Sequence, residues 1–541
     1  MISLRSRTVR LFAAATVMGS GLGLAGLVNS MTTAHADPAY AQTIYVGVGS
    51  DTIQDLFNAY SGAEPTPGAQ PPTAANLPTV YQTPLAGNSA DGSFTMASFD
   101  AIDPHSPFTN AVTTITTKLG SAAIDRPNGS GKGRSALEDE VTGAVWCASP
   151  TVAGCQTIGG KIDFARSSSL GSTAVASSTP SSSVVGQLAY VPLASDGVSY
   201  AYSCANPASA DCAKLDHLSS TDLLNLYTTN AGSTAGGSWG TGTTDTLAAC
   251  GIQTGSGTFG FFGTQIGVPG TTQAVTMDGD IAPRNCHGLE ENSLNSFDTL
   301  IQPPLAAATL AGATSLTVNP LSATTPVAFK VGDSITVGSG GTQDTVTVAT
   351  ITAGTPTTIT FNAGQTLVNA HPATDLVEVA NTDWVFPVSV GSVIGQHNGF
   401  SLNRSGHFLS RITASVVGIG FIDASGGGQY PYQCNGGGVL PLCTGGTWQD
   451  NVAYFGISGG STGKFGRWLF VVLPSNKIVG KGLDKGLADL FYAPGATGGT
   501  AAMCSTSAKA LMTSFGFDSS LPNNATSTGG TCGVAAYTGT N

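Results

Sequence analysis

The chain has 541 residues, of which 41% are hydrophobic and only 10% are charged, so it is long enough for two or three packed domains. Its net charge is −12 and its Lys and Arg residues form no run, which argues against nucleic acid as a partner, because binding a phosphate backbone needs clustered basic side chains. With 72 glycines and frequent Ser/Thr runs, the polar surface consists mainly of hydroxyls and amides, which is more typical of extracellular than of cytosolic proteins.

The N-terminus has the pattern of a secretory signal peptide. Three arginines precede an apolar stretch from residue 11 to about residue 28, and Ala34-His35-Ala36 matches a small-x-small cleavage site. We therefore expect residues 1–36 to be a signal peptide, with the mature chain beginning near Asp37. No lipobox cysteine follows the apolar stretch and no later segment has the length of a spanning helix, so we expect a freely secreted protein, with a retained N-terminal anchor as the alternative.

Ten cysteines fit an extracytoplasmic location, and none of them forms a C-x-x-C pair. Five disulfides are expected, with free thiols or metal ligation as the alternative. Spacing alone does not select a connectivity, and we predict nearest-neighbour pairing. The predicted pairs are Cys147 with Cys155, Cys204 with Cys212, Cys250 with Cys286, Cys434 with Cys443, and Cys504 with Cys532. The seven histidines show no metal-ligand spacing, so neither a metal site nor a cofactor is expected.

Three short Gly/Ser turns, at residues 49–52, 128–131 and 255–258, are each predicted to open a helix. The first follows a predicted strand at 43–48 and precedes apolar residues at helical spacing, with Ser50 as the expected N-cap. The second precedes a helix-forming segment at 134–140, and the third leads into a glycine-containing segment that is less clearly helical. Because a helix start leaves N–H groups unpaired and carries partial positive charge, such turns favour an oxyanion without a basic side chain.

Strand patterns at residues 161–165 and 188–193 and a helical pattern at 221–227 continue an alternating α/β arrangement. Ligands in open α/β sheets bind at the carboxyl ends of strands, where these turns lie. Residues 303–379 break the alternation with short runs rich in Val, Thr and Ile, and we expect them to form a small inserted all-β module. Its strands are predicted at 315–318, 334–337, 345–351, 357–361 and 376–379.

Five motifs in consistent order carry a family resemblance. They are the strings at residues 46–55 (VGVGSDTIQD), 98–101 (SFDA), 126–131 (RPNGSG), 163–168 (DFARSS) and 255–258 (GSGT). Together they resemble the actinobacterial branch of the phosphate-binding proteins that serve ABC transporters, over most of the chain except the all-β module. The resemblance implies a type II periplasmic-binding-protein fold, in which two α/β lobes joined by hinge strands close on phosphate, and it implies an ABC permease as partner.

The resemblance implies that Asp51 and Thr52 of the first turn, Ser130 of the second, and Ser256, Gly257 and Thr258 of the third bind the ligand. With their neighbours, the full set of predicted ligand-binding residues is Ser50, Asp51, Thr52, Ser130, Gly131, Arg166, Ser167, Ser168, Ser256, Gly257 and Thr258. Two positions depart from the family pattern, because the usual acidic residue falls at Ser168 and the usual arginine falls at Ile252. An acceptor-only carboxylate rejects sulfate and an arginine pairs with two oxyanion oxygens, so both departures affect ligand choice.

Two nearby residues are candidates to replace these groups. Asp51 would supply the acceptor and Arg166 the guanidinium. The alternatives are that Arg166 forms a structural salt bridge and that Asp51 is an ordinary acid at a helix N-terminus.

The predicted lobes are discontinuous in sequence. Lobe one comprises residues 37–194 and 466–541, and lobe two comprises residues 195–302 and 380–465, with the module at 303–379. Apolar segments near residues 191–200 and 467–474 are expected to cross between the lobes as buried strands.

Two other functions are alternatives to phosphate capture. Ser458 lies in a G-x-S-x-G pattern, but no helix is predicted after it, so a secreted hydrolase is the lesser alternative and no catalytic residue is assigned. A surface or matrix protein that keeps the binding fold without transport is the other alternative, favoured by the missing lipid anchor and the inserted module.

Overall fold

The computed structural model describes most of the chain from residue 45 onward. The described residues are 45–61, 96–101, 113–118, 120–148, 155–205, 212–229, 246–268, 286, 288–321, 327–401, 408–409, 412, 417–420, 422, 430–435, 440, 443, 446–451, 454, 465–493, 501–519 and 531–541. The predicted signal peptide and the G-x-S-x-G pattern around Ser458 lie outside the described residues.

The fold is mixed α/β, with one large mixed sheet and several small sheets. The large sheet has the order β10-β16-β9-β20-β7-β1-β2, with β17, β21 and β8 beside this path. β1 runs parallel to β2 and β7, and β10 runs parallel to β16, whereas β9 is antiparallel to its neighbours. The strands are β1 Tyr45–Gly49, β2 Met96–Ser98, β7 Phe164–Ser167, β8 Val175–Ala176, β9 Leu188–Ser203, β10 Thr246–Ala249, β16 Thr382–Ser389, β17 Val417–Gly420, β20 Gly466–Pro474 and β21 Tyr537–Gly539.

Helices follow several of these strands. They are α1 Gln54–Tyr60, α2 Gly129–Thr142, α3 Cys212–Leu215, α4 Ser220–Thr229, α5 Gly257–Ile266, α7 Leu294–Ile301, α8 Val390–His397, α10 Ser475–Ile478, α11 Lys485–Phe491 and α12 Thr506–Ser514, with short 3₁₀ turns at Gly340–Thr342, Gly480–Gly482 and Ala502–Cys504. Two-stranded sheets pair β3 Thr114–Ile115 with β4 Ile124–Asp125, β5 Val145–Trp146 with β6 Gln156–Thr157, and β18 Tyr432–Asn435 with β19 Thr447–Asp450.

All three Gly/Ser turns lead into helices, as predicted: α1 follows the first, and α2 and α5 begin within the second and third. The expected N-cap at Ser50 is wrong, because α1 begins at Gln54 with Ile53 at the N-cap position. The turn after β1 is longer than predicted, and its Ser50 side chain hydrogen-bonds to Ser168 instead. The first turn therefore contributes side chains to its surroundings and not a helix cap.

The strand predicted at residues 161–165 is observed at Phe164–Ser167. Asp163 precedes it, and its carboxylate accepts a hydrogen bond from the backbone N–H of Val46 at 2.8 Å. The strand therefore starts after this carboxylate contact and continues to the serine pair at its carboxyl end. Because β1 and β7 are parallel, with Gly49 opposite Arg166, the first turn and Ser167-Ser168 leave the sheet side by side.

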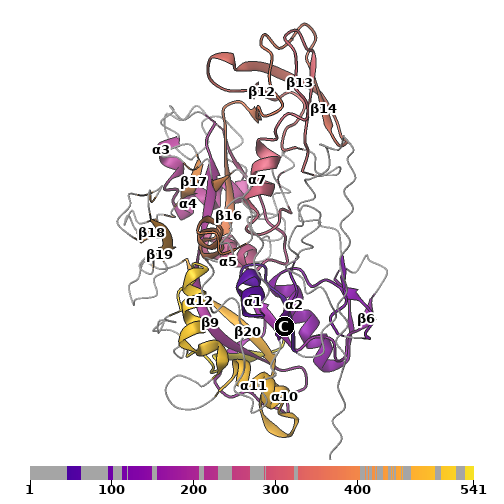
Figure 1. The fold of residues 1–541 in the computed structure, drawn as a ribbon, viewed down its shortest axis with the longest axis vertical. Coiled ribbons are helices and arrows are strands. Elements are labelled where there is room, and N and C mark those ends of the chain that lie inside the picture. The colour runs from indigo at the N-terminus through magenta and orange to yellow at the C-terminus, as the bar shows by residue number, and fades with distance from the viewer. Residues whose placement is uncertain are drawn as a thin grey trace, which may run out of the picture. The chain divides into compact units, whose positions relative to one another are not determined.

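Two long strands lie where crossing strands were predicted. β9 is buried along its whole length and pairs with β20 from Gly466 opposite Gly197 to Pro474 opposite Leu188. Figure 1 shows β9 and β20 next to each other. This pairing places Arg467 directly opposite Asp196. The division of the chain into two lobes remains a prediction.

Residues 315–379 contain a five-stranded antiparallel sheet with the order β11-β14-β13-β12-β15. Its strands are β11 Ser315–Val318, β12 Ser334–Val337, β13 Asp344–Thr352, β14 Thr357–Phe361 and β15 Val377–Val379, close to the predicted ranges. Burial alternates along β11 and β14, as expected for strands with one face on a core. Figure 1 shows β12, β13 and β14 grouped together. That this sheet is an independent inserted module remains a prediction.

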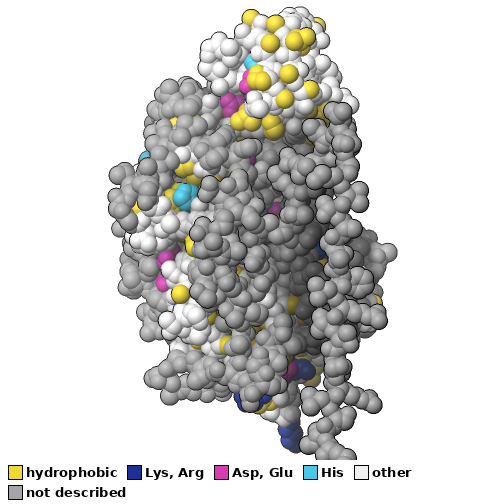
Figure 2. Space-filling view, viewed as in Figure 1, with side chains coloured by type: hydrophobic (Ala, Val, Ile, Leu, Met, Phe, Trp, Pro, Cys, Tyr) yellow, Lys and Arg dark blue, Asp and Glu magenta, His cyan; other side chains and the backbone are white. Residues whose placement is uncertain are grey.

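Figure 2 shows hydrophobic side chains gathered over this sheet, and few Lys or Arg side chains among the described residues on the same face. Exposed apolar residues in this region include Leu310, Val331 and Val368.

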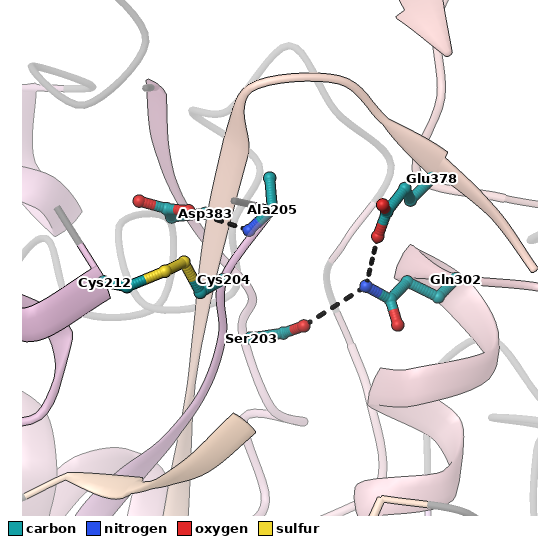
Figure 3. Close-up of a disulfide and its surroundings, with 7 residues drawn as sticks. All are labelled: Ser203, Cys204, Ala205, Cys212, Gln302, Glu378 and Asp383. Carbon is teal, nitrogen blue, oxygen red and sulfur yellow. Dashed lines mark hydrogen bonds between the residues drawn. A yellow bond between two sulfur atoms is a disulfide. The ribbon is translucent and has the colours of Figure 1, made fainter. Parts of the chain in front are cut away.

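The cysteine pairing is confirmed, because the structure joins all ten cysteines in the five predicted pairs. Figure 3 shows the Cys204–Cys212 disulfide at the end of β9. Beside it, the Gln302 amide donates to Glu378 at 2.6 Å and to Ser203 at 3.4 Å, which ties the end of α7 to β15 and β9. Within the described part of the chain, no helix has both the length and the apolar character that crossing a bilayer requires.

Candidate functional site

Four predicted ligand residues form one hydroxyl cluster around Ser168. The Ser168 hydroxyl lies 3.0 Å from the hydroxyl of Ser130, and the hydroxyls of Ser50 and Thr52 each lie 3.4 Å from it. The backbone N–H of Ser168 also donates to Ser130 at 2.9 Å. We call Ser50, Thr52, Ser130 and Ser168 the hydroxyl cluster. Ser168 is therefore the centre of a buried hydroxyl network.

The third turn packs directly on this cluster. The backbone N–H of Gly131 donates to the carbonyl of Gly255 at 3.3 Å, so the second and third turns are in contact. At Gly257 a side-chain carbon would overlap the Ser168 hydroxyl and lie 2.8 Å from the Ser130 hydroxyl. Glycine is required here because the backbone approaches the cluster more closely than any side chain allows. The structure thus brings all three turns together.

A carboxylate that the sequence analysis missed lies where these turns meet. Glu291 precedes α7, is 1% exposed, and accepts hydrogen bonds from the hydroxyls of Thr52, Ser256 and Thr258. Its backbone N–H donates to the Gln253 side chain at 2.9 Å. The donors come from the first and third predicted anion turns, so these turns already hold an anion, and that anion is a side chain of the protein itself.

Arg467 of β20 supplies positive charge beside Glu291 and was also missed. Its Nη2 donates to Thr258 Oγ1 at 2.6 Å and to Thr52 Oγ1 at 3.4 Å, and lies 3.8 Å from Glu291 Oε1. The predicted position for an arginine, Ile252, is instead a fully buried core residue. We call Thr52, Ser256, Thr258, Glu291 and Arg467 the Glu291 site.

Asp196 positions Arg467. One carboxylate oxygen of Asp196 accepts from Nε and Nη2 of Arg467 at 3.1 and 2.8 Å, and the other accepts from Ser389 and from the backbone N–H of Gly391, each at 3.0 Å. The guanidinium is therefore held in one orientation. Its Nη1 is buried, and no acceptor among the described residues reaches it. Arg467 keeps N–H donors available for a ligand.

The two acids of the site have opposite pKa shifts. Burial raises the pKa of Asp51 well above its usual range, and the Glu291 and Glu290 carboxylates raise it further. Burial also disfavours charge on Glu291, but its hydrogen bonds from Asp51, Ser256 and Thr258 and the charge of Arg467 outweigh this and lower its pKa. Asp51 therefore resists ionisation beside Glu291, and no partner among the described residues reaches its buried Oδ1. Burial raises the pKa of Asp196 despite the opposing charge of Arg467.

Arg166 and Ser167 lie apart from the Glu291 site. Arg166 is fully buried, and its guanidinium donates to the backbone carbonyls of Gly49, Ser50 and Phe99 at 3.2, 3.1 and 2.7 Å and to the Ser98 hydroxyl at 2.6 Å. These contacts hold the first turn against β2. Ser167 accepts from Arg134 at 2.8 Å. A direct role of Arg166 in ligand binding remains a prediction.

Sequence signals for the missed residues do exist. Glu291 belongs to a Glu-Glu pair in a chain poor in charge, and Arg467 and Asp196 are charged residues inside two apolar segments predicted to be buried strands. Buried charges need partners, so two opposite charges in adjacent buried strands indicate an ion pair. Among the described residues, no three His, Cys, Asp or Glu side chains are grouped so as to hold a metal ion.

Comparisons with known proteins give one structural likeness. No protein-family model matches the chain, and no curated protein matches it in sequence. Among solved structures, an ABC-type phosphate transport receptor from Vibrio cholerae is similar, with 13% identity and a TM-score of 0.35 over 88% of this chain and 99% of that one. A TM-score of 0.35 does not establish a common fold.

Proposed function

We propose that the protein is a secreted solute-binding protein that captures phosphate or a related oxyanion between two lobes of a type II periplasmic-binding-protein fold. Its release of the ligand to an ABC-type permease is part of the same proposal. The protein acts by binding and not as an enzyme.

The observation that carries this proposal is the carboxylate of Glu291 held by the predicted anion turns. Three hydroxyls from two separate turns and the Arg467 guanidinium surround it. A carboxylate and a phosphate both accept hydrogen bonds through oxygens that share negative charge, so a site built to satisfy one satisfies the other. The site is also buried, and burial strengthens each of these contacts relative to the same contacts in water.

The acids of the site favour an oxyanion that carries a proton. A charged carboxylate only accepts hydrogen bonds, so it binds protonated phosphate, which has an O–H to donate. Sulfate has no proton to donate at neutral pH, so its oxygens would face the carboxylate without a hydrogen bond. Asp51 of the first turn, the acceptor put forward from the sequence, is the group proposed for this role. We therefore propose that phosphate is preferred over sulfate.

Calorimetry tests the proposal. The secreted chain is titrated with phosphate, sulfate, a phosphonate and an organic phosphate at neutral pH. The proposal predicts a phosphate dissociation constant in the micromolar range, which corresponds to a binding free energy on the order of −8 kcal/mol. Sulfate should bind more weakly. Absence of binding to all four anions at millimolar concentration would remove the receptor function.

The exposed apolar residues over the five-stranded sheet favour one second candidate, a surface or matrix protein that keeps the fold without transport. Large contiguous apolar surface often marks interaction sites. That candidate predicts adhesion to cell-surface material together with no heat of binding for any oxyanion in the same titration.

A further inference from the structure

Glu291 uses the groups that an oxyanion would need. The hydroxyls of Thr52, Ser256 and Thr258 each donate to its carboxylate. Thr52 and Ser256 belong to the predicted ligand set through the first and third turns, and Thr258 also accepts from Arg467. A hydroxyl has one proton to donate, so while these three donate to Glu291 they cannot donate to a second anion.

Charge also opposes simultaneous occupancy. Glu291 is 1% exposed, and the adjacent Asp51 and Asp196 add two further carboxyl groups within the same buried region. An oxyanion beside a charged Glu291 would place like charges in contact away from water, which is strongly unfavourable. An anion that enters this site must therefore replace the Glu291 carboxylate or bind much more weakly.

We propose that Glu291 is a built-in competitor of the ligand: its carboxylate occupies the oxyanion position in the empty protein and leaves the hydroxyls of Thr52, Ser256 and Thr258 when the oxyanion binds. This inference depends on the proposed oxyanion-binding function and adds the regulation of that same site. In the empty protein, the Glu291 carboxylate keeps the three hydroxyls and Arg467 in place. The free energy of oxyanion binding is then the difference between the interactions that the site makes with the oxyanion and those that it makes with the Glu291 carboxylate.

The surroundings of Glu291 are compatible with this exchange. Its backbone is fixed by Gln253 and by Asn292, which has a left-handed φ of 60° and whose side chain accepts from the Ser389 N–H at 2.9 Å. Only the Glu291 side chain has to rotate. Nη1 of Arg467, which is buried and without an acceptor among the described residues, adds donors for the incoming oxyanion.

The test compares the wild type with Glu291→Gln, which keeps the shape and removes the charge. Calorimetry with phosphate and with sulfate should show both anions bound by the variant at least about tenfold more tightly, because the competing like charge is gone. Asp222→Asn, which removes a carboxylate of α4 that hydrogen-bonds to Ser219, is the control and should leave both affinities unchanged.

A second measurement does not depend on the variant folding. Glutamate labelled with ¹³C at the side-chain carboxyl is introduced into the wild type, and phosphate is added to saturation. The inference predicts that one buried glutamate signal, identified by its absence in Glu291→Gln, shifts as the carboxylate leaves the three hydroxyls.

The outcomes separate the inference from the proposed function. If the wild type binds phosphate and Glu291→Gln binds it equally or more weakly, Glu291 is a ligand-binding acceptor or a bystander, and the competitor is refuted while the receptor function stands. An unchanged Glu291 signal at saturating phosphate refutes it as well. If neither protein binds any oxyanion, the receptor function itself is wrong.

Discussion

Glu291 and Thr52 lie 239 residues apart in the sequence, yet a hydrogen bond joins their side chains. The same carboxylate reaches Ser256 and Thr258, and Arg467 reaches both threonine hydroxyls. Each of these groups is buried, so each depends on the others for its hydrogen bonds. Single substitutions in this set should therefore change ligand binding by amounts that calorimetry resolves.

Gly257 gives the sharpest steric prediction. In Gly257→Ala the new methyl group would overlap the Ser168 hydroxyl, so the third turn has to move and phosphate binding should fall at least about tenfold. Gly260→Ala is the matched control in the same helix, because a methyl group there meets no atom within 4 Å. It should bind phosphate normally and unfold at an equal or higher temperature, since alanine favours helix. Equal affinities in the two variants would contradict the close approach.

Arg467 and Arg166 are alternative candidates for the guanidinium that binds the ligand. Arg467→Lys keeps the charge but loses the planar fork, and we expect phosphate affinity to fall by about tenfold, the usual effect of losing a charge-assisted hydrogen bond. Arg126→Lys, a buried arginine that donates to the Asp100 carbonyl at 2.9 Å, is the control and should bind normally. If Arg166→Lys loses more affinity than Arg467→Lys, Arg166 is the ligand residue instead.

At the scale of elements, the local parts of the site could be predicted and the distant ones could not. The three turns could be predicted because each is determined by consecutive residues, a Gly/Ser turn followed by helical periodicity. The roles of Glu291 and Arg467 depend on tertiary contacts, since Arg467 faces Asp196 only through the register of β20 on β9. The predicted Ser50 N-cap is wrong for the same reason: contact with Ser168 on the neighbouring strand competes with capping.

The five-stranded sheet contains a buried histidine with a predictable pH response. His371 Nδ1 lies 2.8 Å from Asp375 and Nε2 lies 3.0 Å from Asp344, so both ring nitrogens face carboxylates. Burial lowers the pKa of His371, but these two hydrogen bonds outweigh it and raise the pKa above 6.5. Because the folded pKa is raised, the stabilisation is complete below about pH 6.5 and is lost as the pH rises through the folded value.

Hydrogen exchange of the β13 amides measures this effect. Protection should decrease from pH 6 to pH 9 beyond the intrinsic pH dependence of exchange in the wild type, and His371→Gln should show no such extra decrease. A wild-type protection that is constant after correction would show that the histidine does not titrate in this range.

At the scale of the whole molecule, residues 303–379 can be removed in principle because the two ends of the segment lie together. The backbone N–H of Val377 donates to the Pro303 carbonyl at 3.1 Å, and that of Leu305 donates to the Asp375 carbonyl at 2.9 Å. The segment also shares a hydrophobic core with α7, through Leu300 and Val327 among others. A deletion therefore removes stabilising contacts as well as the sheet.

We expect a variant in which a short glycine linker replaces residues 303–379 to unfold at a lower temperature and to bind phosphate within about threefold of the wild type, because distant sites contribute nearly independently. Calorimetry and thermal unfolding measure the two quantities. A folded deletion variant that has lost phosphate binding would show that the five-stranded sheet takes part in forming the site.

Thr258 is the residue at which the oxyanion site is tested most directly, because its hydroxyl joins Arg467 to the Glu291 carboxylate. Phosphate titrations by calorimetry compare the wild type, Thr258→Val and the exposed control Thr264→Val of the same helix. We predict micromolar binding by the wild type and by Thr264→Val, and affinity lower by about tenfold or more in Thr258→Val. Equal phosphate affinity in Thr258→Val and the wild type, or no binding by any of the three, would contradict an oxyanion site at this position.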